Sequence, residues 1–263
     1  MQFRNLKEKC EYYKSLTDYR LVPNSHILLM LDGRAFSKYT KRFMKPFDDT
    51  FIGLMNSVAL ELCSNIEGAK FAYVQSDEIS IYLTDIGKTE DSIPSSWFQY
   101  RLSKILPIAA SIASSTFMKE YLHKLLNDFK TLEEFKEILT NFKTIEFDAK
   151  AWNVPSANDV YAWFLYRQID CIRNSKQMVA QTYFSHKQLE GKDTDEQIKM
   201  VKELTRIDWH ELPEKYKFGR FLYTEEKKLY SEQYGEYMRN YWTINNGFEL
   251  YQDGSREKFI EII

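Results

Sequence analysis

Apolar and polar positions follow two different periods along the chain, and the change of period predicts the first elements. Residues 3–19 and 50–65 carry apolar side chains at helical spacing, so both segments are expected to form amphipathic helices. Between them, residues 26–31 form an apolar run of strand length that ends at Asp32 and Gly33. This run predicts a buried central strand with Asp32 as its last residue, followed by a turn.

The same reading predicts a hairpin with an acidic tip farther along. Residues 70–74 and 79–83 are rich in β-forming residues and flank the polar run Gln75-Ser76-Asp77-Glu78. A largely helical pattern comes next, and residues 144–148 predict a further strand. The order over residues 26–148 is therefore β-α-β-β-α-β, which is the split βαβ or ferredoxin-like pattern.

The second half of the chain has a different pattern of apolar and polar positions. Residues 158–185 and 195–204 are helical in pattern, whereas the aromatic and charged tail predicts turns but few definite elements. We therefore expect an α+β protein. Residues 1–150 would form a palm-like catalytic core with an N-terminal helix, and residues 151–263 would form a helical extension packed on that core.

Composition narrows the class of protein only slightly. A chain of 263 residues with 44% apolar and 28% charged residues is an ordinary globular protein. Its net charge of −2 gives no chain-wide positive field, so a nucleic-acid partner would require local basic patches. Three isolated cysteines without a C-x-x-C pair predict neither a disulfide framework nor a structural zinc site. With no signal peptide and no apolar run near the roughly 20 residues that span a bilayer, the expected location is cytoplasmic, away from any membrane.

The two acidic turns suggest a catalytic site. Two hard cations require carboxylate oxygens on rigid neighbouring strands, and such a pair of metals supports phosphoryl transfer. Asp32, the carbonyl of Gly33 and Asp77 would be the ligands, with Glu78 as a third ligand or an outer support. The alternative is that Asp32 merely precedes a turn and that Asp77 and Glu78 are solvated charges on a hairpin. Their occurrence together in a split βαβ pattern favours the metal site.

A basic and aromatic loop follows the first acidic turn. Arg34 and Lys45 could bind the triphosphate of a nucleotide, although either could equally be a surface cation. Phe36 could stack on a base or anchor the loop in the core. Ser76 could donate to a phosphate oxygen or simply serve as a turn residue.

Basic and amide side chains also gather on the long helix of the second half and just after it. They include Arg167, Arg173, Asn174 and Lys187. Such groups contact phosphates in RNA complexes, but a solvated helix face explains their spacing equally well.

Taken together, these motifs resemble the tRNA-histidine guanylyltransferase superfamily, whose enzymes add nucleotides in the 3′-to-5′ direction. The matching segments run in family order: Leu31-Asp-Gly-Arg-Ala-Phe36, Phe43-Met-Lys-Pro46, Leu54-Met-Asn56, Ala72-Tyr-Val-Gln-Ser-Asp-Glu78, Phe147-Asp-Ala-Lys150 and Arg167-Gln-Ile-Asp-Cys171.

The resemblance implies a polymerase-type palm that acts on tRNA, and a homotetramer. It implies two Mg²⁺ ions held by Asp32, Gly33 and Asp77, with support from Glu78. The residues it implies for binding the nucleotide are Gly33, Arg34, Ala35, Phe36, Ser37, Lys45 and Ser76. It also implies that ATP or GTP activates a 5′-monophosphorylated RNA end, that the 3′-hydroxyl of an incoming nucleotide attacks this end, and that pyrophosphate leaves.

Departures from the eukaryotic enzymes indicate a subgroup. The eukaryotic His-Ile-Asn-Asn stretch is replaced by Ile172-Arg-Asn-Ser175, and Ser37 replaces a loop histidine. The chain resembles instead the bacterial-type guanylyltransferase-like 3′-5′ RNA polymerases, which repair truncated tRNA 5′ ends under the direction of a template. The alternatives are addition of the extra 5′ guanylate to tRNA-histidine, a nucleotide cyclase, and an RNA-binding module with a decayed site.

Overall fold

A six-stranded antiparallel sheet forms the centre of the computed structural model, which describes residues 3–87, 96–128, 131–140, 144–231, 233 and 235–263. The strand order is β4-β1-β3-β2-β5-β6. The strands are β1 (His26–Gly33), β2 (Ala69–Gln75), β3 (Glu78–Thr84), β4 (Phe147–Val154), β5 (Arg220–Ser231) and β6 (Gly235–Asn245).

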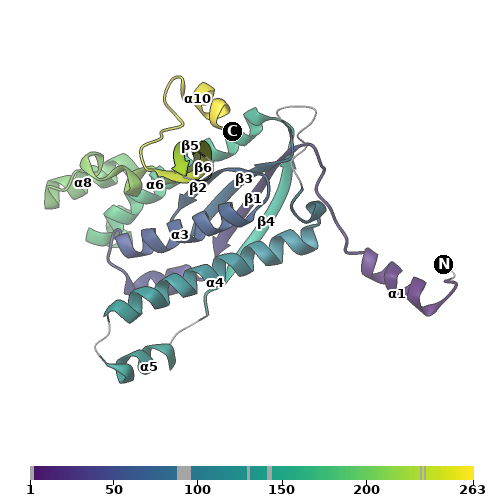
Figure 1. Cartoon of the computed structure of the whole chain (residues 1–263). Coiled ribbons are helices and arrows are strands. Elements are labelled where there is room, and N and C mark those ends of the chain that lie inside the picture. Colours follow the sequence, from purple (N-terminus) through teal and green to yellow (C-terminus); the bar gives the residue numbers. More distant parts are fainter. Residues whose placement is uncertain (1–2, 88–95, 129–130, 141–143, 232, 234) are drawn as a thin grey trace.

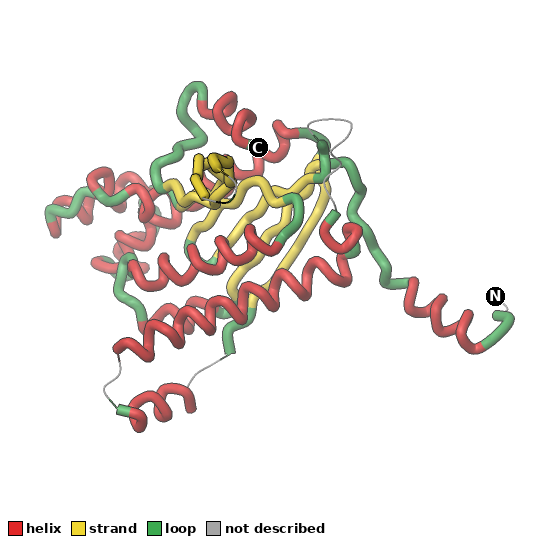
Figure 2. The backbone as a smooth tube through the Cα atoms, in the orientation of Figure 1, coloured by secondary structure: helices red, strands yellow, loops and turns green. Residues whose placement is uncertain are grey.

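Helices cover both faces of this sheet (Figures 1 and 2). The described helices are α1 (Leu6–Ser15), α2 (Phe36–Tyr39), α3 (Asp49–Asn65), α4 (Leu102–Asp128), α5 (Leu132–Thr140), α6 (Ala157–Tyr183), α7 (His186–Leu189), α8 (Thr194–Thr205), α9 (Glu214–Lys217) and α10 (Ser255–Ile262). The helices α3 and α4 lie on one face, and α6 and α10 lie on the other. Among the described helices, none combines the length and the apolar character that crossing a bilayer requires.

The alternation of side chains in β1 explains why residues 27–31 are all apolar. Ile27, Leu29 and Leu31 belong to the core under α3 and α4, whereas Leu28 belongs to the core under α6. A strand that is buried on both faces has no solvent-facing side, so it reads as a continuous apolar run. This burial fixes the register of β1, which in turn fixes the position of Asp32 at its end.

The predicted first strand, the helix after it and the acidic hairpin are confirmed as β1, α3 and β2–β3, although β1 ends at Gly33, one residue past the predicted end at Asp32. The carboxylate of Asp48 begins α3 by accepting the N–H groups of Thr50 and Phe51, at 2.8 Å and 3.0 Å. The same carboxylate accepts the N–H of Met44 at 2.9 Å, which ties the basic loop to the start of α3. The strand expected at residues 144–148 begins later, at Phe147, and a boundary at residue 150 would fall inside β4.

The prediction of a helical second half is wrong for Arg220–Ser231 and Gly235–Asn245. These segments form β5 and β6, and β5 pairs with β2 so that the sheet continues across both halves of the chain. Phe221 and Leu222 are fully buried, but the following part of β5 carries exposed charges. That outer part extends past the helices into solvent, where no buried face imposes an apolar alternation, so its strand pattern is weak in the sequence.

Candidate active site

Acidic residues from three strands meet at one end of the sheet. Asp32 on β1 lies opposite Glu78 on β3 and opposite Asp148 on β4, and residues in register share one face of a sheet. Asp77 lies in the two-residue turn between β2 and β3, where its carbonyl accepts the N–H of Gly33 at 3.1 Å. The structure therefore brings the two predicted acidic turns together.

The backbone at this junction depends on one glycine and on two residues with positive φ angles. A Cβ atom on Gly33 would lie 2.4 Å from the ring of Phe36, so only glycine lets this ring pack beneath the strand end. Ala35 and Ser76 have positive φ angles of 57° and 46°, which cost a residue with a side chain on the order of 1–2 kcal/mol. Local strain of this kind is typical of positions that a functional site requires.

Negative charge at the junction is only partly compensated. Burial raises the pKa of Asp32, and the neighbouring carboxylate of Asp148 raises this pKa further. Burial also raises the pKa of Asp77; the charge of Asp32 adds to that effect, although a hydrogen bond from Ser76 opposes it. Neighbouring carboxylates whose pKa values are raised form a site that a cation would stabilise.

The donor set suits a hard divalent cation. Asp32, Asp77 and the carbonyl of Gly33 offer only oxygen atoms, which is the ligand type that Mg²⁺ prefers. In the part of the chain that the structure describes, no three Asp, Glu, His or Cys side chains form a ready metal cluster. A cation held here would therefore depend on two carboxylates, with water or a phosphate completing its coordination, as is usual for Mg²⁺.

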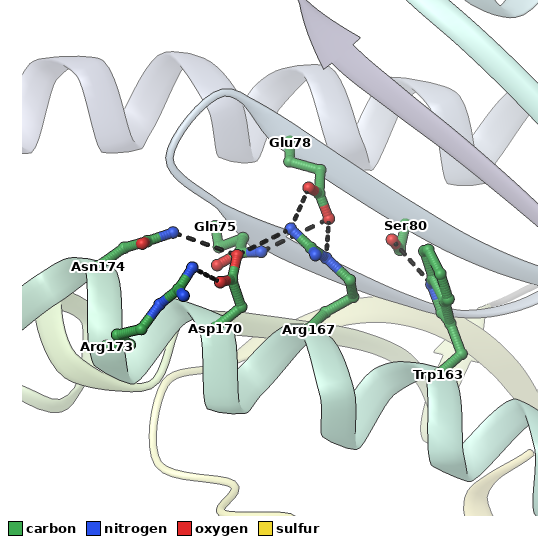
Figure 3. Close-up of polar contacts among 8 residues, drawn as sticks. All are labelled: Gln75, Glu78, Ser80, Trp163, Arg167, Asp170, Arg173 and Asn174. Atoms are coloured by element: carbon green, nitrogen blue, oxygen red, sulfur yellow. Dashed lines mark hydrogen bonds and ion pairs between the residues drawn. The ribbon is translucent and has the colours of Figure 1, made fainter.

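Glu78 does not point freely into this site, because Arg167 on α6 binds both of its carboxylate oxygens (Figure 3). Nε of Arg167 donates to Oε1 at 2.7 Å, and Nη2 donates to Oε2 at 2.5 Å. The two side chains are only 12% and 9% exposed. Burial raises the pKa of Glu78, whereas the hydrogen bonds and charge of Arg167 lower it. A bidentate pair of this kind fixes the carboxylate in one orientation.

The predicted RNA-binding residues fall into two groups. Arg167 lies inside the protein, between the hairpin and α6, and does not belong to a solvated helix face. Arg173 and Asn174 lie nearly two turns farther along α6 and donate to the carboxylate of Asp170 at 2.5 Å and 3.2 Å. Lys187 is exposed on α7, and no hydrogen bond or ion pair joins it to the described residues.

The loop after Asp32 is anchored by its aromatic residue. Phe36 is 2% exposed and packs against the rings of Tyr39, Phe51, Phe117 and Phe147. Of the two roles considered for its side chain, the structure shows the core anchor.

The polar side chains of this loop remain at the surface. Arg34 is exposed and its Nη1 donates to the carboxylate of Glu146 at 2.7 Å, while Ser37 is exposed on α2. The guanidinium of Arg34 thus has a surface partner that a phosphate could replace.

Lys45 and Ser76 line a common pocket with a volume of about 100 Å³ that opens to solvent. The other lining residues are Thr40, Phe43, Met44, Pro46, Phe47, Asp48, Phe51, Ile52, Met178, Lys215, Tyr216 and Arg220. The rings of Phe47 and Tyr216 stack in parallel, with centroids 4.6 Å apart. Sequence reasoning missed Met178, Tyr216 and Arg220, because only the pairing of β5 with β2 and the path of α6 bring them to the hairpin tip.

Comparison with known proteins places these features in one family. The family model described as tRNAHis guanylyltransferase matches residues 7–155. The chain is 27% identical to the tRNA(His) guanylyltransferase of Neurospora crassa, covering 95% of this chain and 79% of that protein. It is 28% identical to tRNA(His) guanylyltransferase 1 of Arabidopsis thaliana, covering 83% of this chain but only 37% of that longer protein.

A solved structure shows the same arrangement over almost the whole chain. It is a bacterial tRNA(His) guanylyltransferase-like protein in complex with ATP, with 27% identity and a TM-score of 0.79. The alignment covers 98% of this chain and 99% of that one, so the similarity includes the second half that the family model leaves out. Since the family model itself matches more than half of the 263 residues, the chain belongs to the tRNAHis guanylyltransferase family.

Proposed function

We propose that this protein is a Mg²⁺-dependent 3′-to-5′ nucleotidyltransferase that adds nucleotides to the 5′ end of tRNA under the direction of a template. One observation carries the proposal: Asp32 on β1 and Asp77 in the β2–β3 turn meet at one sheet end beside a pocket lined by Lys45 and Ser76. Carboxylates next to a phosphate-binding pocket are the parts that metal-assisted phosphoryl transfer requires. Family membership supports the choice of a tRNA end as the acceptor.

The framework of the proposed site is a polymerase-type palm. The order β1-α3-β2-β3-α4-β4 and the strand order β4-β1-β3-β2 support a split βαβ unit, to which β5 and β6 add a further edge. In this reading the palm ends with β4, and α6 to α10 form the part of the chain that packs on the palm and meets the tRNA.

Asp32, the carbonyl of Gly33 and Asp77 would hold the two Mg²⁺ ions. The metal supplies charge neutralisation on the phosphates and lowers the pKa of an attacking hydroxyl. Glu78 supports this site from outside rather than as a free ligand, since Arg167 already occupies both of its oxygens. Arg167 is then a positioning residue that holds the β2–β3 tip in place.

The nucleotide would lie along the hairpin tip with its phosphates toward the basic loop. Lys45 and the hydroxyl of Ser76 bind the triphosphate, and Arg34 leaves Glu146 to join them. The N–H groups of Ala35, Phe36 and Ser37, beside the start of α2, offer further donors to an anion.

The reaction has three balanced steps. An RNA 5′-phosphate oxygen attacks the α-phosphorus of ATP or GTP and pyrophosphate leaves, which gives an activated 5′ end. The 3′-hydroxyl of the incoming nucleoside triphosphate then attacks the RNA 5′ phosphorus, loses its proton, and expels the nucleoside monophosphate. The new 5′ end finally loses pyrophosphate by hydrolysis. Positioning and charge stabilisation account for most of the catalysis in such transfers.

Arg173, Asn174 and Lys187 are the proposed RNA contacts, because they are exposed on α6 and α7. A homotetramer in the cytoplasm is part of the same proposal. A light-scattering mass near four times 31.4 kDa would support the tetramer, and a monomer mass would oppose it.

Incubation with 5′-truncated tRNAs tests the proposed function. Purified protein, Mg²⁺ and each labelled triphosphate are supplied with transcripts that differ only in the base opposite the missing 5′ nucleotide. Templated repair predicts that the added base changes with the opposing base. Addition of guanylate regardless of that base would support the other candidate, a tRNA-histidine guanylyltransferase, which the named relatives favour equally. No addition to any transcript would contradict both.

A further inference from the structure

A series of charges of alternating sign leads from the β2–β3 tip along α6 to the protein surface (Figure 3). Glu78, which lies opposite Asp32 in the sheet, accepts two hydrogen bonds from Arg167. Nη2 of Arg167 also donates to Oδ2 of Asp170 at 3.2 Å, and Oδ1 of Asp170 accepts Nη2 of Arg173 at 2.5 Å. The series therefore connects the acidic site to an arginine that RNA can reach.

The members of this series differ in how deeply they are buried. The side chains of Glu78, Arg167 and Asp170 are 9%, 12% and 18% exposed, whereas that of Arg173 is 61% exposed. An exposed arginine exchanges a carboxylate partner for a phosphate at little cost, because water already surrounds the pair. The inner groups lie in a less polar environment, where each charge depends strongly on its neighbours.

Arg167 is shared unequally between two carboxylates. Its Nη2 atom lies 2.5 Å from Oε2 of Glu78 and 3.2 Å from Oδ2 of Asp170, so the bond to Glu78 is the stronger one. If a phosphate draws Arg173 away, Asp170 keeps Asn174 and Arg167 as its donors among the described residues. A carboxylate that loses one of two cations attracts the remaining cation more strongly.

We propose that Asp170 is a positioning residue that couples RNA binding at Arg173 to the metal site. The proposal rests on the nucleotidyltransferase function proposed above and names a control on its site. Without RNA, Arg167 holds Glu78 and reduces the negative charge beside Asp32. When an RNA phosphate engages Arg173, Arg167 shifts toward Asp170 and partly releases Glu78. The charge of Glu78 then adds to that of Asp32, so a divalent cation binds more tightly once RNA is in place.

The first test measures metal binding without RNA. Mn²⁺ shares the preference of Mg²⁺ for oxygen ligands, and electron paramagnetic resonance reports how much of it is free. Arg173→Met removes one cation from Asp170, as RNA would. Mn²⁺ is therefore expected to bind this variant about fivefold more tightly than the unaltered protein, the low end of typical couplings between sites. Lys187→Met removes an exposed charge outside the series and should leave the Mn²⁺ affinity unchanged. An unchanged affinity for Arg173→Met would overturn the proposal.

The second test shows whether Asp170 carries the effect. In a protein with Asp170→Asn, the added change Arg173→Met is expected to leave the Mn²⁺ affinity unchanged, because the group that passes the effect to Arg167 has lost its charge. An equal gain with and without Asp170→Asn would mean that the charge of Arg173 acts directly on the metal site, and the proposal would be wrong.

The third test uses RNA and remains decisive even if Asp170→Asn does not fold. By reciprocity, a metal whose binding RNA tightens must tighten RNA binding by the same factor. Fluorescence anisotropy measures the affinity for a labelled 5′-truncated tRNA with EDTA and with Mg²⁺. The response of the RNA itself to Mg²⁺ is common to all variants. Lys187→Met is expected to keep the tightening by Mg²⁺ that the unaltered protein shows, and Arg173→Met is expected to lose it. Equal tightening in both variants would contradict the coupling.

Failure of the coupling and failure of the function on which it rests give different results. Tighter Mn²⁺ binding by Arg173→Met, in a protein that adds no nucleotide to any RNA, would contradict the proposed function and leave the coupling standing. Nucleotide addition to tRNA together with metal binding that does not respond to Arg173→Met would do the reverse.

Discussion

Asp32 and Asp77 determine the chemistry of the site. They lie close together, and little positive charge compensates their negative charge. Each is placed at the end of an element whose register is fixed by burial, and the bond from Gly33 N–H to the carbonyl of Asp77 holds them at one point. Their carboxyl pKa values are raised mainly by burial, with a neighbouring carboxylate adding to each. A protein that keeps such a pair gains little stability from it, so the pair points to function.

Removing one of these charges should stabilise the metal-free protein. The folded-state pKa of Asp77 lies above its unfolded value, so its stabilising contribution is complete below the unfolded pKa and is lost as pH rises through the folded pKa. In the presence of a chelator, Asp77→Asn is therefore expected to raise the free energy of unfolding at about pH 7, with a gain that fades toward about pH 3.

Urea unfolding at a series of pH values measures this gain, with the exposed substitution Asp253→Asn as the control. A gain that does not change with pH, or a loss at neutral pH, would show that the carboxylate of Asp77 is not under electrostatic strain.

At the scale of elements, α6 and the β2–β3 hairpin are joined by one buried ion pair. Arg167 reaches Glu78 at the hairpin tip, and the faces of Trp163 and Tyr166 lie beside its guanidinium. Trp163 also donates to Ser80 at 3.1 Å (Figure 3). The long helix thus holds the strand that carries the catalytic tip.

Breaking this pair from one side should be costly. Arg167→Met is expected to lower the free energy of unfolding by about 3–5 kcal/mol, because Glu78 is left buried without its cation. The double variant Arg167→Met with Glu78→Gln should recover part of that loss, since no unpaired charge remains. Arg173→Met, on the exposed side of the same helix, should cost less than about 1 kcal/mol. Denaturant unfolding measures all three, and a small effect of Arg167→Met would contradict the structural role.

The sequence predicts an element well where a single periodicity governs it. The apolar run of β1, the stripe of α3 and the two halves of the hairpin each bury a defined face, so their patterns are clear. Arg167 was grouped with the surface residues of the long helix, but it is buried against the hairpin. Helical spacing shows which residues share a face of the helix, but it does not show what packs against that face. The role of Phe36 stayed open for the same reason, since an aromatic residue in a loop fits a core or a ligand equally well.

At the scale of the whole molecule, the sheet joins the two halves of the chain. Phe221 and Leu222 of β5 and Phe259 of α10 are fully buried, and they contribute to the same cores as β1 to β4. By contrast, α1 has no buried residue and extends away from the rest of the molecule (Figure 1). The long-range pairing of β5 with β2 could not be read from the sequence, because pairing depends on contacts about 150 residues apart.

A chain that ends at residue 155, where the family match ends, is therefore expected not to fold cooperatively. It would lose α6 and β5, which cover one face and one edge of the sheet. Removal of residues 1–17 should instead leave the melting temperature nearly unchanged. Circular dichroism and calorimetry measure both, and a sharp unfolding transition for residues 1–155 would show that the palm is an independent domain.

The most direct test of the proposed function is nucleotide incorporation by carboxylate variants. Labelled nucleotide addition to a 5′-truncated tRNA is measured for the unaltered protein, Asp32→Asn, Asp77→Asn and Asp253→Asn. Asp253 is the control, because it is exposed and lies outside the acidic site. Asp32→Asn and Asp77→Asn are each expected to lower the rate at least about a thousandfold with the fold intact, since several kcal/mol of charge stabilisation are lost, whereas Asp253→Asn should stay close to the unaltered rate. Incorporation that persists when Asp32 and Asp77 are both replaced would contradict the metal site and the reaction proposed for it.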